Sequence, residues 1–131
     1  MDTASASTAV ETALAYHRAW TARDLESAMG YIADDIVCEA PAGTIHGAEA
    51  YRSFMAPFVG MLTGARLHAA FGDERTAVVF YDTSTQLVPH APGSECVTVA
   101  GGRIVHSRFV FDRLPFEEAR RVMPRPAAHD L

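Results

Sequence analysis

The side chains that could do chemistry in this chain are a few scattered carboxylates, hydroxyls, thiols and imidazoles. Asp82 lies in the strand-like stretch TAVVFYDTSTQLV. A carboxyl group among apolar side chains has a raised pKa and could act as a general base or acid. Tyr16 could donate a hydrogen bond to a developing oxyanion. An acid or base beside such a donor fits metal-free enolisation, aldol-type cyclisation or double-bond isomerisation.

The sequence contains no motif typical of a metal site or a nucleotide-binding site. No H-x-x-x-H or similar spacing relates the six histidines, which are His17, His46, His68, His90, His106 and His129. Gly101-Gly102 reads as a hairpin turn rather than a phosphate-binding loop before a helix. Cys38 and Cys96 are expected to be reduced and partly buried, and no histidine lies beside Cys38 to activate it as a nucleophile. We therefore expect no metal and no cofactor.

Composition narrows the possible partners. The chain has 131 residues, of which 49% are hydrophobic and 21% charged, and its formal charge of -5 includes no basic run for nucleic acid. No apolar run approaches the roughly 20 residues that span a bilayer. The first residues, MDTASASTAVE, lack the basic and apolar regions of a signal peptide. We expect a cytoplasmic protein that contacts neither nucleic acid nor membrane.

The positioning elements begin with helices. Thr8 and Glu11 have the spacing of a capping box, which predicts a helix to about Ala22. Asp24 can cap a short second helix, and DIVCEAP then reads as a strand whose Glu39 faces away from Cys38 and Ala40. After a turn bracketed by two glycines, AEAYRSFMAPFVGML predicts a helix, in which Pro57 should cause a kink or a break.

From residue 63 onward the pattern has a period of two. It predicts four strands, ARLHAAF, TAVVFYDTSTQLV, ECVTVA and RIVHSRFVFD, with turns at GDE, PHAPGS and GG. Helices followed by antiparallel strands indicate an α+β fold. A short helix, FEEARRVM, should follow Pro115. We predict a disordered N-terminus over residues 1–7, one domain over 8–123 and a flexible tail over 124–131.

Three stretches together resemble a known superfamily. They are YHRAWTARDLESAMGYIADDIVCEAPAGTIHG, the helix after it, and GGRIVHSRFVFD, and over about residues 8 to 118 they are similar to the nuclear transport factor 2-like, SnoaL-like fold. The resemblance implies a cone-shaped, curved antiparallel sheet wrapped by three helices around a central pocket. It also implies a homodimer through the outer sheet face. Because this fold hosts many activities, it does not by itself identify one.

The acids of characterised relatives are missing. In ketosteroid isomerases, which this chain resembles most over its first third, an oxyanion-donating tyrosine falls on Tyr16. The catalytic base falls on Ala40, and the second oxyanion donor falls on Thr98. The aspartate of limonene epoxide hydrolases and of SnoaL-like cyclases falls on Phe109, and the hydrolase's Arg and Asp fall on Asp82 and Ser84. The established chemistry of these relatives is therefore not expected.

Strand alternation within the implied architecture gives a candidate pocket. Asp82 is the only carboxylate that it directs inward, so Asp82 and Tyr16 are the predicted catalytic residues. Asp112 is directed outward, as a strand-end cap or ion-pair partner. The predicted ligand-binding residues are apolar with a few polar groups: Trp20, Cys38, Met55, Phe58, Phe80, Ser84, Thr98, Ser107, Phe109 and Phe111. This lining suits a small hydrophobic molecule.

Four alternatives stay open. A shift of one residue in register would direct Tyr81, Thr83 and Thr85 inward and expose Asp82 to solvent. Tyr16 could be a core residue rather than a catalytic one. We predict a cofactor-free isomerase or cyclase acting on an apolar cyclic or polyketide-like molecule; the other hypotheses are a non-catalytic protein that binds or sequesters a hydrophobic ligand, and a dimerising interaction module.

Overall fold

Six strands and four helices make up residues 8–122, the part of the chain that this computed structural model describes. The predicted N-terminal segment 1–7 and tail 124–131 lie outside it. The elements follow the chain in this order: α1 Ala9–Thr21, α2 Leu25–Met29, β1 Ile32–Ala40, β2 Gly43–His46, α3 Ala48–Met61, β3 Leu62–Gly72, β4 Thr76–Thr85, β5 Ala91–Ala100, β6 Arg103–Phe111 and α4 Leu114–Val122.

Local sequence signals place the helix starts. The Thr8 hydroxyl accepts from the Glu11 amide at 3.1 Å, and the Glu11 carboxylate accepts from the Thr8 amide at 3.2 Å, so the capping box is formed. Asp24 caps α2 by accepting from the Ser27 amide at 3.1 Å. α3 continues through Pro57, so the predicted break does not occur.

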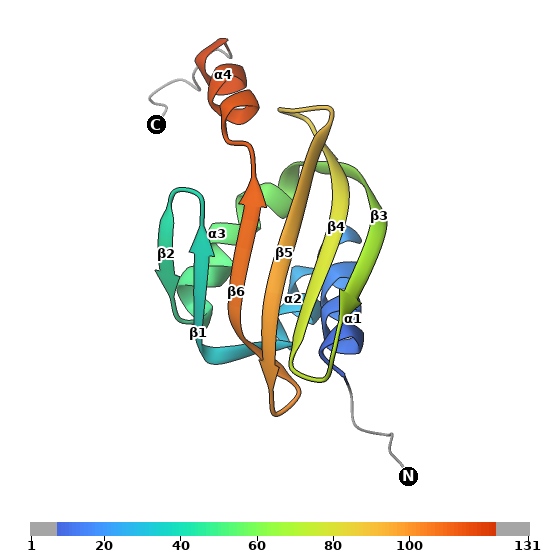
Figure 1. Cartoon of the computed structure of the whole chain (residues 1–131). Coiled ribbons are helices and arrows are strands. Elements are labelled where there is room, and N and C mark those ends of the chain that lie inside the picture. Colours follow the sequence, from blue (N-terminus) through green and yellow to red (C-terminus); the bar gives the residue numbers. More distant parts are fainter. Residues whose placement is uncertain (1–7, 123–131) are drawn as a thin grey trace.

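The strands form one curved sheet in the order β2-β1-β6-β5-β4-β3 (Figure 1). The predicted α+β class is confirmed, with one difference in the sheet. β1 and β6 pair in parallel, while every other pairing is antiparallel. β2 occupies the region expected to be a turn. The last strand thus lies in the middle of the sheet, beside the first.

β5 begins four residues earlier than its sequence predicts. Ala91–Ser94, which read as part of a turn, pair with β4, and Gly93 lies opposite Tyr81. A Cβ atom at position 93 would lie 3.2 Å from the Tyr81 ring. The glycine that suggested a turn therefore makes room for an aromatic ring on the neighbouring strand.

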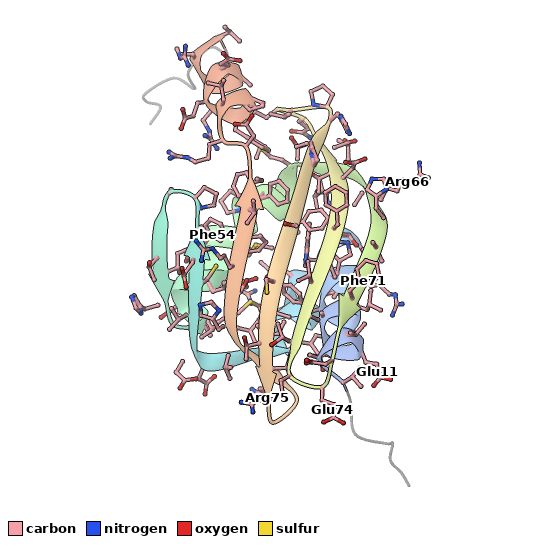
Figure 2. The ribbon with its side chains drawn as sticks, viewed as in Figure 1. Glu11, Phe54, Arg66, Phe71, Glu74 and Arg75 are labelled. Carbon is pink, nitrogen blue, oxygen red and sulfur yellow. The ribbon has the colours of Figure 1, made fainter. Side chains whose placement is uncertain are left out.

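Helices α1, α2 and α3 cover one face of the sheet, here called the inner face, and α4 extends beyond one end of it (Figure 1). Trp20, Tyr16 and Tyr51 are fully buried between these helices and the sheet. The opposite, outer face carries exposed apolar side chains. Figure 2 labels Phe71 there, with 72% of its surface exposed. Within residues 8–122, no helix has the length and apolar character that crossing a membrane requires.

Candidate functional site

A cavity of about 340 Å³ lies between the inner face and helices α3 and α4. Its wall is largely apolar. The lining residues are Ala40, Pro41, Ala42, Phe54, Met55, Pro57, Phe58, Met61, Tyr81, Thr83, Ala91, Pro92, Gly93, Phe109, Phe111, Arg113, Phe116, Glu117 and Arg120. Met55, Tyr81 and Phe109 are among the most buried of them and form its floor. The size and lining are typical of a site for one small apolar molecule.

A buried polar cluster adjoins this floor at Phe109, and we call it the Glu95 cluster: Tyr16, Cys38, Tyr51, Glu95 and Ser107. The Ser107 hydroxyl donates to Glu95 Oε2 at 2.5 Å, and the Tyr51 hydroxyl donates to the same oxygen at 3.4 Å. Tyr51 is also hydrogen-bonded to Tyr16. Four hydroxyl and carboxyl groups from four elements thus form one connected chain.

Burial changes the acidity of the whole cluster. Glu95 is 1% exposed, and loss of hydration raises the pKa of its carboxyl group from 4.5 to about 8. The hydrogen bonds from Ser107 and Tyr51 oppose this shift without cancelling it. Desolvation, reinforced by Glu95, also raises the pKa values of Tyr16 and Tyr51, and it raises that of the Cys38 thiol to about 12. At neutral pH Glu95 is mostly protonated, and Cys38 is an inert thiol.

The cluster and the cavity adjoin each other at Phe109. Glu95 lies directly opposite Phe109 in the β5–β6 register and two residues from Gly93, and both of these residues line the cavity. Glu95 itself is not a lining residue. Its Oε1 atom is buried and has no hydrogen-bond partner among the described residues. A buried carboxyl group with one unpartnered oxygen therefore lies beside the floor residue Phe109 without lining the cavity.

Tyr81 is the polar aromatic residue of the floor. Its ring packs against Trp20 and His17, with centroids 5.5 Å and 4.9 Å away. Gly93 leaves space beside it. Burial raises the pKa of the Tyr81 hydroxyl, with a further contribution from Glu95, so it stays protonated as a hydrogen-bond donor. Burial likewise lowers the pKa of His17 to about 4 and keeps it neutral.

The predicted inward direction of Asp82 is wrong. Along β4 the buried residues are Ala77, Val79, Tyr81, Thr83 and Thr85, so the alternative register holds. Asp82, Phe80 and Ser84 therefore lie on the outer face. The physical reason is that both faces of β4 carry apolar residues, and the packing of Tyr81 against Trp20 fixes the choice.

On the outer face Asp82 lies between two histidines. His68 Nε2 is 2.8 Å and His90 Nε2 is 3.3 Å from Asp82 Oδ2. The hydrogen bond from His68 is the main reason that the pKa of Asp82 is lowered. Neither histidine lines the cavity. Among the described residues, no three side chains of the ligating types are arranged to hold a metal ion.

Most of the other predicted residues either line the cavity or are buried on the inner face beside it. Met55, Phe58, Phe109 and Phe111 line the cavity. Tyr16, Trp20, Cys38 and Ser107 are buried on the inner face but do not line it.

Thr98 was expected inside and lies on the outer face, because β5 buries Glu95, Val97 and Val99 instead. On the same face His106 Nε2 donates to Glu39 Oε2 at 2.7 Å, which confirms that Glu39 points away from the cavity. Asp112 accepts from the Leu114 amide at 3.0 Å at the strand end.

Sequence reasoning missed Glu95 and Tyr51. A carboxylate is seldom fully buried, and strand alternation directed only Asp82 inward. The signal that could have placed it inside is that it shares a strand face with Val97 and Val99, whereas the other face carries Cys96 and Thr98. For Tyr51, the helical pattern of AEAYRSFMAPFVGML contains no signal that points to a partner for its hydroxyl.

Comparisons with known proteins agree with this architecture. The family model described as a SnoaL-like domain matches residues 13–107. A crystal structure of a protein from Kribbella flavida DSM 17836 is 54% identical, with a TM-score of 0.85, and the match covers 94% of this chain and 97% of that one. No protein among those with curated functions matches the chain.

Two more distant structures carry activities in their descriptions. A protein from Jannaschia sp. CCS1, described as a candidate SnoaL-like polyketide cyclase, has a TM-score of 0.73 at 15% identity, covering 88% of this chain and 92% of that one. An epoxide hydrolase of M. tuberculosis, similar to limonene epoxide hydrolase, has a TM-score of 0.68 at 16% identity, covering 84% and 86%. At these identities the likeness concerns the fold.

Proposed function

The chain belongs to the SnoaL-like domain family, and we propose that it is a cofactor-free enzyme that isomerises or cyclises a small apolar molecule by acid/base chemistry. The observation that carries this proposal is the buried Glu95 carboxyl group, with a pKa raised to about 8, directly beside Phe109 in the wall of an apolar cavity. A general acid or base works best when its pKa lies near the working pH.

Each member of the site has a role in this reaction. Glu95 takes a proton from a carbon next to a carbonyl group and returns it to another position, using the Oε1 atom that has no other partner. Ser107 and Tyr51 orient the carboxyl group through Oε2, and Tyr16 supports Tyr51. The Tyr81 hydroxyl is the donor on the floor that can stabilise an enolate oxygen. A bound ligand must displace part of the floor beside Phe109 to reach Glu95.

Two activities of distant relatives fit less well. The positions of β4 that face the cavity are Tyr81 and Thr83, and neither can replace the Arg and Asp that epoxide hydrolases of this fold use. The acid that cyclases carry on the last strand falls on Phe109. We therefore propose proton transfer next to a carbonyl group, with Glu95 on β5 as the acid that these relatives place elsewhere.

The test follows hydrogen exchange rather than one particular product. The protein is incubated in D₂O with a panel of cyclic ketones and β-diketones, and loss of the proton next to the carbonyl is followed by NMR. We expect catalysed exchange with at least one compound, at a rate that rises with pH toward about 8 as Glu95 ionises. Glu95→Gln should abolish the exchange, and Asp82→Asn should not change it. Equal exchange by the Glu95→Gln protein would overturn the proposal.

A second candidate function is ligand binding without turnover. The observation that favours it is that Glu95 is 1% exposed and does not line the cavity. Under this alternative, apolar ketones bind and quench the fluorescence of the single tryptophan, Trp20, but none exchanges its protons. Binding that is identical in the wild-type and Glu95→Gln proteins, with no exchange in either, would select this function.

We also propose that the protein forms a homodimer through the outer face. Exposed apolar side chains gather there on β3, β4 and β6, and they include Phe71, Phe80 and Val110, at 72%, 48% and 59% exposure. Burying such a patch would favour association. Phe80→Asp should convert a dimer to a monomer in sedimentation experiments, whereas Leu114→Asp on α4 should leave it unchanged. A wild-type protein that is monomeric at all concentrations would contradict this.

A further inference from the structure

Charge is confined to one side of the cavity. Among its described lining residues, the charged ones are Arg113, Glu117 and Arg120, and all three belong to α4 or to the residue before it. We call these three residues the α4 rim. Two guanidinium groups and one carboxylate give the rim a formal charge of +1, although the whole chain carries -5. The wall of the cavity is thus apolar at its floor and positive at its rim.

The rim is held in place by aromatic packing. Phe116, on the same helix, is buried against Phe58 and Phe111, with ring centroids 6.4 Å and 5.9 Å away. This contact seats α4 over the end of the sheet, where Figure 1 shows it next to the last strand. A side chain fixed on a packed helix loses less freedom when it binds a ligand than one on a loose segment.

The pairing within the rim is uneven. Arg113 Nη2 lies 2.9 Å from Glu117 Oε2, one helical turn away, and both side chains are about half exposed. The rim therefore has only one carboxylate for two guanidinium groups. A guanidinium group presents paired donors that match a carboxylate, phosphate or sulfonate. Beside an apolar wall such a pair is less screened than in open water.

We propose that the ligand of this cavity is an apolar molecule that carries a single anionic group, bound at the rim by Arg120 with help from Arg113. This inference rests on the proposed function and narrows its substrate class. With the anion at the rim, the apolar end of the ligand points toward Tyr81 and Phe109. The reacting carbon then lies at the floor, next to Phe109 and Glu95, and the ligand binds in one orientation.

The test compares three probes of one shape: 2-naphthoate, its neutral methyl ester and 2-naphthylmethylamine. Their dissociation constants are measured by calorimetry with the full chain. We expect the naphthoate to bind at least about tenfold more tightly than the ester, as one charge-assisted hydrogen bond would give, and the amine to bind most weakly. Added salt should weaken the binding of the naphthoate and not that of the ester.

Two variants of α4 should change naphthoate binding in opposite directions, and a third serves as a control. Arg120→Gln should weaken naphthoate binding by about fivefold or more, and Glu117→Gln should strengthen it, because it removes the negative charge and releases Arg113. Arg121→Gln is the matched control, since Arg121 is the next residue on the helix and does not line the cavity. None of the three should change binding of the ester by a comparable factor.

The outcomes separate this inference from the proposed function. If the naphthoate and the ester bind equally, or if Arg121→Gln weakens naphthoate binding as much as Arg120→Gln does, the assignment of the rim is wrong while an apolar binding site remains. If neither probe binds, both the rim assignment and the binding of apolar molecules are overturned. If both bind and the Glu95→Gln protein retains hydrogen exchange, only the proposed reaction fails.

Discussion

Glu95 and Asp82 lie on neighbouring strands and have the same functional group, but their environments are opposite. Glu95 points to the inner face, where desolvation raises its pKa to about 8. Asp82 points to the outer face, where the hydrogen bond from His68, with a smaller one from His90, keeps its pKa below the ordinary value. The comparison teaches that the face of the strand determines the acidity of a carboxyl group more than its residue type does.

The two carboxyl groups also differ in what their neighbours do. Ser107 and Tyr51 are neutral donors that leave Glu95 able to hold a proton, and one of its oxygens is without a partner. His68 and His90 donate hydrogen bonds to Asp82 and so favour its ionised form. Only the first arrangement keeps a proton available at neutral pH. The following predictions test this difference, beginning with the largest expected effect.

The largest effect is the pH dependence of stability. The folded chain keeps the proton of Glu95 up to about pH 8, whereas the unfolded chain loses it near 4.5. The folded state therefore binds more protons in this window, and the free energy of unfolding falls as the pH rises. A shift of this size corresponds to a loss on the order of 5 kcal/mol across the window.

His17 defines the range in which this loss is cleanest. The pKa of His17 is lowered from 6.5 to about 4, so the contribution of His17 to stability increases between these two pH values. In that range it partly offsets the loss of stability caused by Glu95. Between pH 6.5 and 8 we expect a net fall of about 2 kcal/mol in urea denaturation. Glu95→Gln should remove it, and Asp82→Asn should leave it. A flat profile for the wild-type protein in this range would contradict the raised pKa.

The next effect compares a phenylalanine on each face. Phe109 is 7% exposed and stacks on Tyr51, so Phe109→Ala should reduce the free energy of unfolding by about 3 kcal/mol. Phe80 is 48% exposed, so Phe80→Ala should reduce the free energy of unfolding by less than about 1 kcal/mol. Measuring both variants at two protein concentrations separates folding from association through the outer face. Equal losses would mean that the faces are reversed.

A smaller effect concerns the donors around Glu95. Ser107→Ala removes a hydrogen bond that lowers the pKa of Glu95, so the pKa should rise further above 8, at a cost of about 1–3 kcal/mol in stability. The titration is followed by ¹³C NMR of the Glu95 carboxyl carbon. Ser94→Ala, on the outer face of the same strand, is the matched control and should not shift it.

The smallest effect is expected at Asp82. Its lowered pKa means that its contribution to stability is present at neutral pH and is lost as the pH falls through its folded-state pKa. Asp82→Asn should therefore be slightly less stable than the wild-type protein at pH 7, and the difference should vanish in acid. Because the site is open to solvent, added salt should also reduce it. A difference as large as that of Glu95→Gln would remove the contrast between the two faces.

Much of the fold could be predicted from local sequence. Thr8, Glu11 and Asp24 predict the starts of two helices, because capping depends on residues three apart. The alternation of β1 and β6 is also correct, with Cys38, Ser107 and Phe109 on the inner face. In these strands one face is clearly more polar than the other, so the local pattern is enough.

The register of β4 and β5 could not be predicted in this way. On β4 both faces carry large apolar residues, Val79 and Tyr81 inside and Val78 and Phe80 outside. The choice between them depends on Trp20, which is 61 residues away in sequence and packs on Tyr81. On β5 a glutamate is buried because hydroxyls from β6 and α3 meet it there. In both strands, contacts between distant segments determine which residues face inward, and a local pattern does not contain these contacts.

The place of β6 in the sheet has a consequence for how the chain is made. Because β6 lies between β1 and β5, the hairpin of β1 and β2 has no neighbouring strand until residues 103–111 have been synthesised. Up to that point the edges of β1 and β5 are open and could pair with other chains. A sheet that depends on such distant pairing is expected to fold slowly and all at once. A nascent chain that ends before β6 should therefore be a target for chaperones, whereas one that ends after it should not.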